Sequence, residues 1–368
     1  MACDPLLPWF KSLRNAIRKK TFGYDRHGDN VPLLDYYFNK KNNELLESIL
    51  KTDLKIQIPK EDQSENLNKR ISKRMEAECC DLISILPNIQ KSNYGDWIND
   101  FFHYMKQIRK IQGSIMGIKE PWISEFFPAL LKNDNSSRFI IIFRDPRAVL
   151  ASMFKADMNG YEKIGQPLSV LRHWRKQANL FSIYRKDTEL SSKIHMLRYE
   201  DLVNDPISTI KQLIHELDLN FESPMIDTDS FTGYSESATP PGNSSYETIK
   251  SGIQKWPIDR WRDTLPGHLT QLCELVCGQE MIELGYPIEI MEPRQLSWIN
   301  EYELWEKNKK FSWRTDRQDL LPDIALEILR QEVIEGKKIV DDSLVRQLFY
   351  KHEVLKDLQK VKKSLISP

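Results

Sequence analysis

The sequence is poor in glycine, with 14 among 368 residues, so a glycine-rich loop that cradles phosphate would stand out in it. Cysteine is scarcer still. The five cysteines lack the spacing of a disulfide framework or a zinc site, and we expect buried or unpaired thiols. The longest strongly apolar run, Phe139–Phe143, falls far short of the roughly 18 residues of a membrane span. The first twenty residues also lack the apolar core of a signal peptide. As written, the chain is expected to have no membrane span and to stay in the cytoplasm.

The chain has no excess of either charge, because its 53 basic and 53 acidic side chains cancel. This balance excludes a chain that binds nucleic acid or membranes mainly through bulk charge, although local basic pockets stay open. Hydrophobic residues make up 40% and charged residues 29%, which favours a packed globular core. The length fits one large domain or two ordinary ones.

Composition divides the chain into three predicted parts. Residues 1–31 are basic and then polar, which predicts a loose leader. Residues 32–290 hold the main domain, with expected N-terminal helices over 32–52, 65–87 and 93–110. Residues 291–368 are charged and periodic, which predicts a helical C-terminal extension with helices over 317–335 and 341–364.

The main domain is predicted to be an α/β domain with a parallel sheet. Phe139–Phe143 is β-branched and apolar at every position, which is typical of a strand buried on both faces. Ser114–Ile118 and Lys193–Tyr199 are the other strand candidates, and strands alternate with helices. The expected helices of this region cover Pro146–Phe154, Leu168–Arg185, Pro206–Leu217 and Leu269–Leu284. Residues 221–257 are rich in Ser, Thr, Gly and Pro and are expected to form a long functional loop.

A chemically suggestive string follows directly on the strand Phe139–Phe143. It reads Arg144-Asp-Pro-Arg-Ala-Val-Leu-Ala-Ser152. Ligands of open α/β sheets bind beyond the carboxyl ends of the strands, where arginine donors suit a phosphate and a serine hydroxyl adds a hydrogen bond. The alternative is a helix opened by Asp145-Pro146, with Arg144 and Arg147 as solvated charges.

The full string resembles the 3′-phosphate-binding motif of sulfotransferases that use 3′-phosphoadenosine-5′-phosphosulfate (PAPS), in its carbohydrate sulfotransferase form. Three further stretches resemble family segments in the same order: Ile118–Pro121, Leu197–Pro206, and Trp261-Arg262 with the segment Cys277–Tyr286. The resemblance covers just under half of the chain. It implies a P-loop-type parallel sheet flanked by helices, with the C-terminal helical tail added to it. It also implies PAPS as the sulfuryl donor, no metal, and a Golgi location.

The resemblance implies roles for individual residues. Arg144 and Ser152 would hold the 3′-phosphate, and Tyr199 would lie against the adenine. Arg260 and Arg262 would close over the nucleotide. A structural alternative stays open for three of these residues. Tyr199 could form a hydrogen bond with a backbone group at a strand end, and Arg260 and Arg262 could be solvated charges at the start of a helix.

Two pairs of residues have structural readings that we favour. Glu200 and Asp201 are expected to cap the following helix. Trp174 and Trp256 are expected to pack in the core.

The family's loop for the 5′-phosphosulfate, of the Gly-x-x-Arg-Ser-Gly-Ser type after an N-terminal strand, has no counterpart in this sequence. Upstream of Lys119 no glycine lies between an apolar strand and a helix, and His27–Asn30 is the nearest imitation. We therefore expect this half of the donor site to be missing. The chain would then be either a truncated product or a form that no longer catalyses.

A sulfotransferase needs a base that takes the proton from the acceptor hydroxyl. Glu120 is the best candidate, and Lys119 beside it could contact the sulfuryl group or the leaving phosphate. Glu120 in an ion pair with a nearby basic residue is the alternative.

The predicted function is transfer of a sulfuryl group from PAPS to a hydroxyl of a small-molecule or carbohydrate acceptor, with a carbohydrate as the acceptor that the motif resemblance implies. The alternative is an inactive, sulfotransferase-like protein that binds nucleotide or another protein. A nucleotide kinase-like P-loop protein would need a Gly-x-x-x-x-Gly-Lys-Ser/Thr loop, which the sequence lacks. The acceptor and the oligomeric state do not follow from the sequence.

Overall fold

The computed structural model describes residues 6–24, 37–60, 65–76, 79–110, 115–121, 123–158, 166–227, 253, 255, 257–289, 296–307 and 320–366. The chain divides into two compact units. Unit 1 consists of Met1–Pro32, Glu44–Ser137 and Ser230–Ser244, and unit 2 consists of Leu33–Asn43, Arg138–Asp229 and Ser245–Pro368. Each unit is described by itself.

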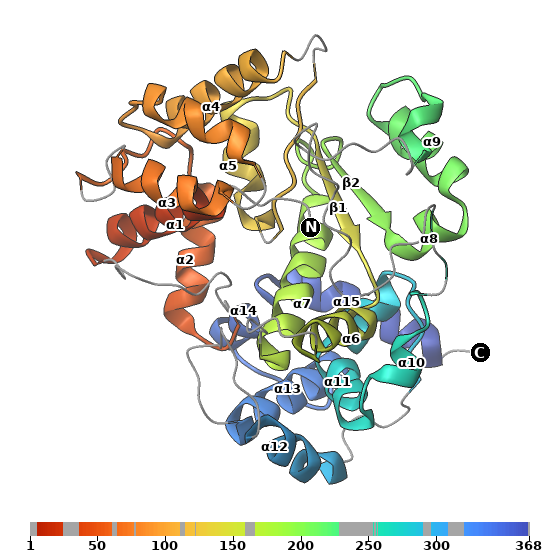
Figure 1. Ribbon diagram of the computed structural model, residues 1–368. Coiled ribbons are helices and arrows are strands. Elements are labelled where there is room, and N and C mark those ends of the chain that lie inside the picture. Colours follow the sequence, from red (N-terminus) through yellow and green to blue (C-terminus); the bar gives the residue numbers. More distant parts are fainter. Residues whose placement is uncertain are drawn as a thin grey trace. The chain divides into compact units, whose positions relative to one another are not determined.

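Unit 1 is helical in its described part (Figure 1). Its core is aromatic: the ring of Trp9 meets the ring of Tyr94 edge-on at 5.4 Å, and Trp97 stacks on Phe101 at 5.6 Å. The Asn93 side chain accepts a hydrogen bond from the backbone N–H of Asp96 and so caps one helix. The elements are α1 (Leu7–Phe22), α2 (Lys40–Lys51, its first turn in unit 2), α3 (Glu65–Met75), the 3₁₀ helix η2 (Cys80–Asn88), α4 (Tyr94–Ile108), the 3₁₀ helix η3 (Ser124–Phe126) and α5 (Phe127–Asn133).

The predicted loose leader is wrong for the residues of α1. Trp9, Leu13 and Ile17 recur at helical spacing and are buried, and α1 packs against α3. Gly23, with φ of +77°, ends the helix in the left-handed conformation that glycine adopts without strain. The basic character of the segment misled the prediction, because Arg14 is buried with the apolar face. Residues 25–31 lie outside the described part.

Truncating α1 in the core therefore has a measurable cost. Leu13 is fully buried, so we expect Leu13→Ala to lower the free energy of unfolding by about 2–5 kcal/mol. Lys20→Ala, on the exposed side of the same helix, should change it by no more than about 0.5 kcal/mol. Urea unfolding of the two variants checks this, and equal midpoints would mean that α1 is not part of the core.

Two further predictions for unit 1 need correction. The expected helix over 65–87 is split into α3 and η2, and the expected strand Ser114–Ile118 is absent from residues 115–118, where Ile115 is exposed. A short apolar run needs a neighbouring strand to pair with, which sequence alone does not supply. The predicted helix over 93–110 is confirmed by α4.

Unit 2 contains a parallel pair of strands, β1 (Phe139–Phe143) and β2 (Ile194–Arg198), with Phe143 opposite Arg198 (Figure 1). Within the described residues these two strands make up the sheet, which confirms a parallel α/β arrangement but in a small form. The helices are α6 (Pro146–Met158), α7 (Pro167–Tyr184), α8 (Tyr199–Asn204), α9 (Pro206–Glu216), η4 (Ser223–Ile226), α10 (Trp261–Thr264), α11 (Gly267–Glu283), η5 (Leu296–Trp298), α12 (Ile299–Lys307), α13 (Leu320–Ile334), α14 (Asp342–Phe349) and α15 (His352–Ile366).

The expectation that β1 is buried on both faces is wrong. Ile141 and Phe143 are buried, whereas Ile140 is 44% and Ile142 is 59% exposed. On the buried face, the Phe143 ring contacts the rings of Trp174 and Phe181 on α7. Apolar composition shows that a strand can be covered on both faces, but not that a layer is present on each.

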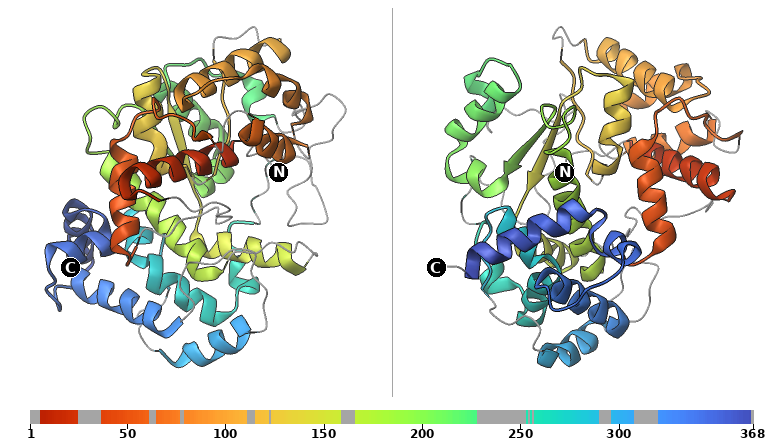
Figure 2. Two further views of the ribbon diagram at one scale, coloured as in Figure 1. Left: turned by 90° about the vertical axis from the view of Figure 1, so that its left-hand side faces the viewer. Right: turned by 180° about the vertical axis from the view of Figure 1, so that it is seen from behind.

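The predicted C-terminal extension is not a separate element in the described part. Helices α13 and α15 pack against α11, and α15 also packs against α7, all within unit 2 (Figure 2). The expected helix over 341–364 is broken at Tyr350, whose φ is +67°. Most of the predicted long loop, from residue 228 to 252, lies outside the described residues.

The cysteines differ from the expectation at one position. Cys79 is disulfide-bonded, whereas Cys80, Cys273 and Cys277 are free. The prediction of buried or unpaired thiols is therefore wrong for Cys79 and confirmed for Cys80, Cys273 and Cys277, and Cys3 lies outside the described residues.

Candidate nucleotide site

The carboxyl ends of β1 and β2 lie side by side, and the chain turns out of each strand into a predicted site residue. Arg144 follows β1, and Tyr199 follows β2 as the first residue of α8. The guanidinium carbon of Arg144 lies 4.6 Å from the centre of the Tyr199 ring. The parallel register thus brings together two of the five residues that the sequence assigned to the nucleotide.

Arg144 keeps hydrogen-bonding capacity toward a ligand. One terminal nitrogen, Nη2, donates to the carbonyl oxygen of Pro257 at 2.9 Å, which orients the side chain. Its Nε is buried and has no hydrogen-bond partner among the described residues. A buried guanidinium N–H without an acceptor is costly, so an anion bound there would stabilise it.

The positive charge of Arg144 acts on Arg260. Burial, and then the positive charge of Arg144, lower the pKa of Arg260. Two guanidinium groups that repel one another are a suitable pair for one phosphate, because an anion between them removes the repulsion. The residues present therefore fit the 3′-phosphate half of a PAPS molecule.

Ser152 lies in the second turn of α6 and is half-buried. It follows the site-forming turn on the same helix, as the motif requires. Its part in phosphate binding stays a prediction.

Glu200 fixes the turn between β1 and α6. Its carboxylate accepts from the backbone N–H of Asp145 at 2.9 Å and from the Tyr286 hydroxyl at 3.0 Å. Burial, and then Glu200, raise the pKa of Tyr286. The sequence predicted only a helix cap for Glu200. It did not predict these contacts, because they form only where the ends of β1 and β2 pair. Asp201 is exposed and lies 3.8 Å from Arg198.

Arg147 is not a solvated charge. It is fully buried, donates to Asp145 and to Glu274 on α11, and its guanidinium carbon lies 4.0 Å from the centre of the Trp261 ring. The second arginine of the motif therefore joins α6 to α10 and α11 and is fully occupied by these partners.

Arg262 faces a different region from Arg260. It pairs with Glu289 and with Asp259, and it lines a cavity of about 580 Å³. Arg144, Ser152 and Tyr199 do not line this cavity. Because acidic partners already neutralise Arg262, its predicted contact with the nucleotide would require those ion pairs to open. Other residues that line the cavity are Trp261, His268, Trp298 and Glu301.

Lys119 and Glu120 belong to unit 1, in an extended segment that is not a strand. Lys119 is exposed, whereas Glu120 is half-buried and its Oε1 accepts from the backbone N–H of Leu6 at 2.5 Å. Leu6 precedes α1, so the carboxylate lies where a helix N-terminus favours a negative charge. This contact is structural, and the predicted roles of both residues in catalysis stay predictions.

Trp174 was expected to be a core residue, and it is buried. In addition, its indole Nε1 donates to the carbonyl oxygen of Arg144 at 2.9 Å. No sequence signal identifies this bond, because Trp174 belongs to a separate helix, α7, outside the motif that contains Arg144. Trp256 and His27–Asn30 lie outside the described residues.

Two negative findings apply to the part of the chain that the structure describes. It contains no group of three or more His, Cys, Asp and Glu side chains placed to hold a metal ion. None of its helices is long and apolar enough to cross a membrane.

A parallel strand pair with Arg144 and Tyr199 together at its carboxyl ends defines an α/β protein with a candidate nucleotide site. The sequence profile of the Sulfotransferase family matches residues 24–223. The chain belongs to this family.

Curated relatives are distant and longer. Carbohydrate sulfotransferase 3 of Mus musculus is 26% identical over 202 residues, which are 48% of this chain and 42% of that protein. Carbohydrate sulfotransferase 3 of Homo sapiens is 26% identical over 189 residues, 44% of this chain and 38% of that protein. The chain thus spans less than half of the length of these relatives.

Two solved structures are similar at low identity. The sulfotransferase domain from the curacin biosynthetic pathway is 17% identical with a TM-score of 0.40, and covers 77% of this chain and 96% of its own. The sulfotransferase domain from the Synechococcus PCC 7002 olefin synthase is 16% identical with a TM-score of 0.43. This match covers 78% of the present chain and 94% of that domain. At TM-scores below 0.5 this likeness is too weak to define the fold. The expected absence of the 5′-phosphosulfate loop stays a prediction.

Proposed function

We propose that this chain binds PAPS through Arg144, Arg260, Ser152 and Tyr199 and transfers its sulfuryl group to a hydroxyl of a carbohydrate. The single observation that carries the proposal is the buried Nε of Arg144, which has no acceptor in the described part and lies at the end of a parallel strand. Family membership supports the donor. The names of the relatives support the acceptor class.

Each residue has a distinct task in this proposal. Arg144 and Arg260 would neutralise the 3′-phosphate, with Ser152 donating a further hydrogen bond. Tyr199 is held by the Arg144 guanidinium on one side of its ring, and its free surface would pack against the adenine. PAPS, when bound, supplies the sulfuryl group and a bisphosphate leaving group.

The transfer requires a base for the proton of the acceptor hydroxyl. We propose Glu120 for this role, and Lys119 as the residue that neutralises charge developing on the leaving phosphate. Glu120 would have to release the Leu6 amide or act through its second carboxylate oxygen. This assignment requires that Glu120→Gln keep the affinity for the nucleotide and lose sulfuryl transfer.

One covalent bond bears on the compartment in which we propose that the chain acts. Disulfides persist in oxidising compartments, and Cys79 is disulfide-bonded. This supports the Golgi lumen, which the motif resemblance implies.

The direct test is sulfuryl transfer from ³⁵S-labelled PAPS to a panel of hydroxylated acceptors, with neutral and acidic oligosaccharides beside phenols and steroids. We expect label on an oligosaccharide, dependent on Arg144 and independent of added metal or chelator. Label on a phenol alone would contradict the carbohydrate acceptor. Nucleotide binding without transfer to any acceptor would favour the inactive, sulfotransferase-like alternative.

A further inference from the structure

The peptide group that joins Arg144 to Asp145 is held on both of its edges. Its carbonyl oxygen, from Arg144, accepts from Trp174 Nε1 at 2.9 Å, and its N–H, from Asp145, donates to Glu200 at 2.9 Å. Because a peptide group is planar, two hydrogen bonds on opposite edges fix its rotation about the Cα–Cα axis. The Cα of Arg144 is one end of that axis, so the two bonds restrain the backbone from which the Arg144 side chain leaves the end of β1.

Trp174 is itself rigidly placed on α7. Its ring is buried, and it meets the ring of Phe143 edge-on at 5.8 Å and the ring of Tyr286 edge-on at 6.3 Å. The indole thus rests on the last residue of β1 and donates to the next carbonyl. A phenylalanine at position 174 would keep most of these ring contacts and lose only the donor.

The residues on either side of Trp174 attach α7 to the C-terminal helix α13. Arg172 donates to Asp323 at 3.1 Å and to Glu327 at 2.7 Å, and Arg175 donates to Glu327 at 2.5 Å. All four side chains are buried. These charge-assisted bonds set the rotation and axial position of α7 over the one turn that carries Trp174.

We propose that Trp174 is a positioning residue for the nucleotide site, and that α13 acts on this site through α7 and the Trp174–Arg144 hydrogen bond. The inference rests on the nucleotide site proposed above. It gives the C-terminal helices, which lie far from Arg144 in sequence, a part in setting the direction of the phosphate-binding guanidinium.

The test compares Trp174→Phe with Trp298→Phe. Trp298 is a matched control, because it is also buried in unit 2 and its Nε1 has no hydrogen-bond partner in the described part of the chain. We expect Trp174→Phe to weaken binding of adenosine 3′,5′-bisphosphate about tenfold, the loss of one hydrogen bond to an oriented group. We expect Trp298→Phe to leave the affinity unchanged.

Amide hydrogen exchange supplies a readout that does not depend on the nucleotide. In the free protein, Trp174→Phe should speed exchange in peptides covering residues 143–150, whereas Trp298→Phe should not. Equal exchange and equal affinity in the two variants would overturn the role of Trp174. Wild-type protein that fails to bind the bisphosphate would overturn the nucleotide site instead, and the exchange comparison would still decide the role of Trp174.

A double-mutant cycle tests the coupling to α13. Asp323→Asn alone should reduce affinity by a few fold through a less firmly held α7, and it should add almost nothing in the Trp174→Phe background. Full additivity of the two losses would contradict a path through Trp174. The thermal midpoint of each variant, measured in parallel, separates loss of positioning from loss of folded protein.

Discussion

Arg144→Ala is expected to abolish measurable binding of adenosine 3′,5′-bisphosphate, with a loss in affinity of about 100-fold or more. The substitution removes the buried Nε donor and one of two neighbouring positive charges, so at least two charge-assisted bonds to the 3′-phosphate are lost. Arg144→Lys should fall between wild type and alanine, because an ammonium keeps the charge but not the planar pair of donors. Isothermal calorimetry at one salt concentration measures all three.

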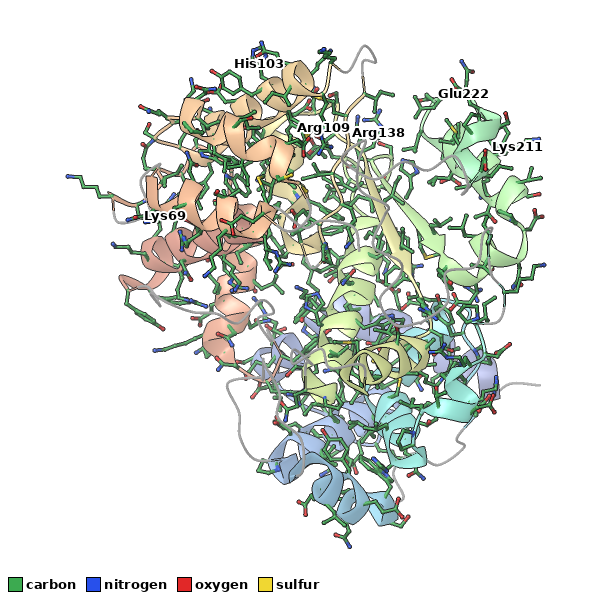
Figure 3. All side chains as sticks on the ribbon, viewed as in Figure 1. Lys69, His103, Arg109, Arg138, Lys211 and Glu222 are labelled. Atoms are coloured by element: carbon green, nitrogen blue, oxygen red, sulfur yellow. The ribbon has the colours of Figure 1, made fainter. Side chains whose placement is uncertain are left out.

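The matched control is Arg138→Ala. Arg138 precedes β1, at the opposite end of the strand from Arg144, and is exposed (Figure 3). We expect this variant to bind the bisphosphate as the wild type does. An Arg144→Ala protein that is folded and binds with wild-type affinity would show that the phosphate is held elsewhere.

Glu327→Gln is expected to produce the largest loss of stability of any single isosteric change in unit 2. Glu327 is fully buried and accepts from both Arg172 and Arg175, so the change leaves the buried Arg175 without its carboxylate partner and Arg172 with Asp323 alone. Breaking a buried ion pair on one side costs about 3–5 kcal/mol. Denaturant unfolding monitored by circular dichroism measures the loss.

Glu332→Gln on the same helix serves as the control. Glu332 pairs with Lys338 across 3.9 Å at the surface, where an ion pair contributes about 0–1 kcal/mol. The two variants carry the same chemical change on one helix, so a similar loss in both would contradict the view that the network of α7 and α13 is a principal support of unit 2.

The pH dependence of Glu327 follows from its surroundings. Burial raises the pKa of Glu327, but the charges of Arg175 and Arg172 outweigh this and lower the pKa below its usual value. A depressed pKa stabilises the folded state above the unfolded pKa of about 4.3, and this contribution is lost as the pH falls through the folded pKa. The wild type should therefore lose stability more steeply below about pH 5 than Glu327→Gln does. Equal slopes for the two proteins would contradict this assignment.

Local patterns predicted the elements around β1 and β2 well. An apolar run followed by Asp-Pro predicted strand and helix because both signals lie within a few residues of one another, and the strands pair in parallel as expected. Where burial decides structure, local patterns failed. The basic residues of α1 hid a buried apolar face, and β1 proved to be exposed at Ile140 and Ile142. The number of layers around an element depends on segments far away in sequence.

The candidate site divides in the same way. The resemblance assigned Arg144 and Tyr199 to different parts of one nucleotide, and the register of the two strands brings these residues together. The contacts of Trp174, Glu200 and Pro257 at the same turn could not be predicted, since each comes from a separate segment with no motif of its own. The family resemblance gave Arg262 the same role as Arg260, whereas in the structure Arg262 pairs with Glu289.

The most direct test of the central claim is a crystal structure of the protein with adenosine 3′,5′-bisphosphate. The account predicts the 3′-phosphate within hydrogen-bonding distance, about 2.7–3.2 Å, of the Arg144 guanidinium at the end of β1, with the adenine beside Tyr199. Nucleotide bound instead in the cavity lined by Arg262 and Trp298, with Arg144 still lacking an acceptor at Nε, would contradict it.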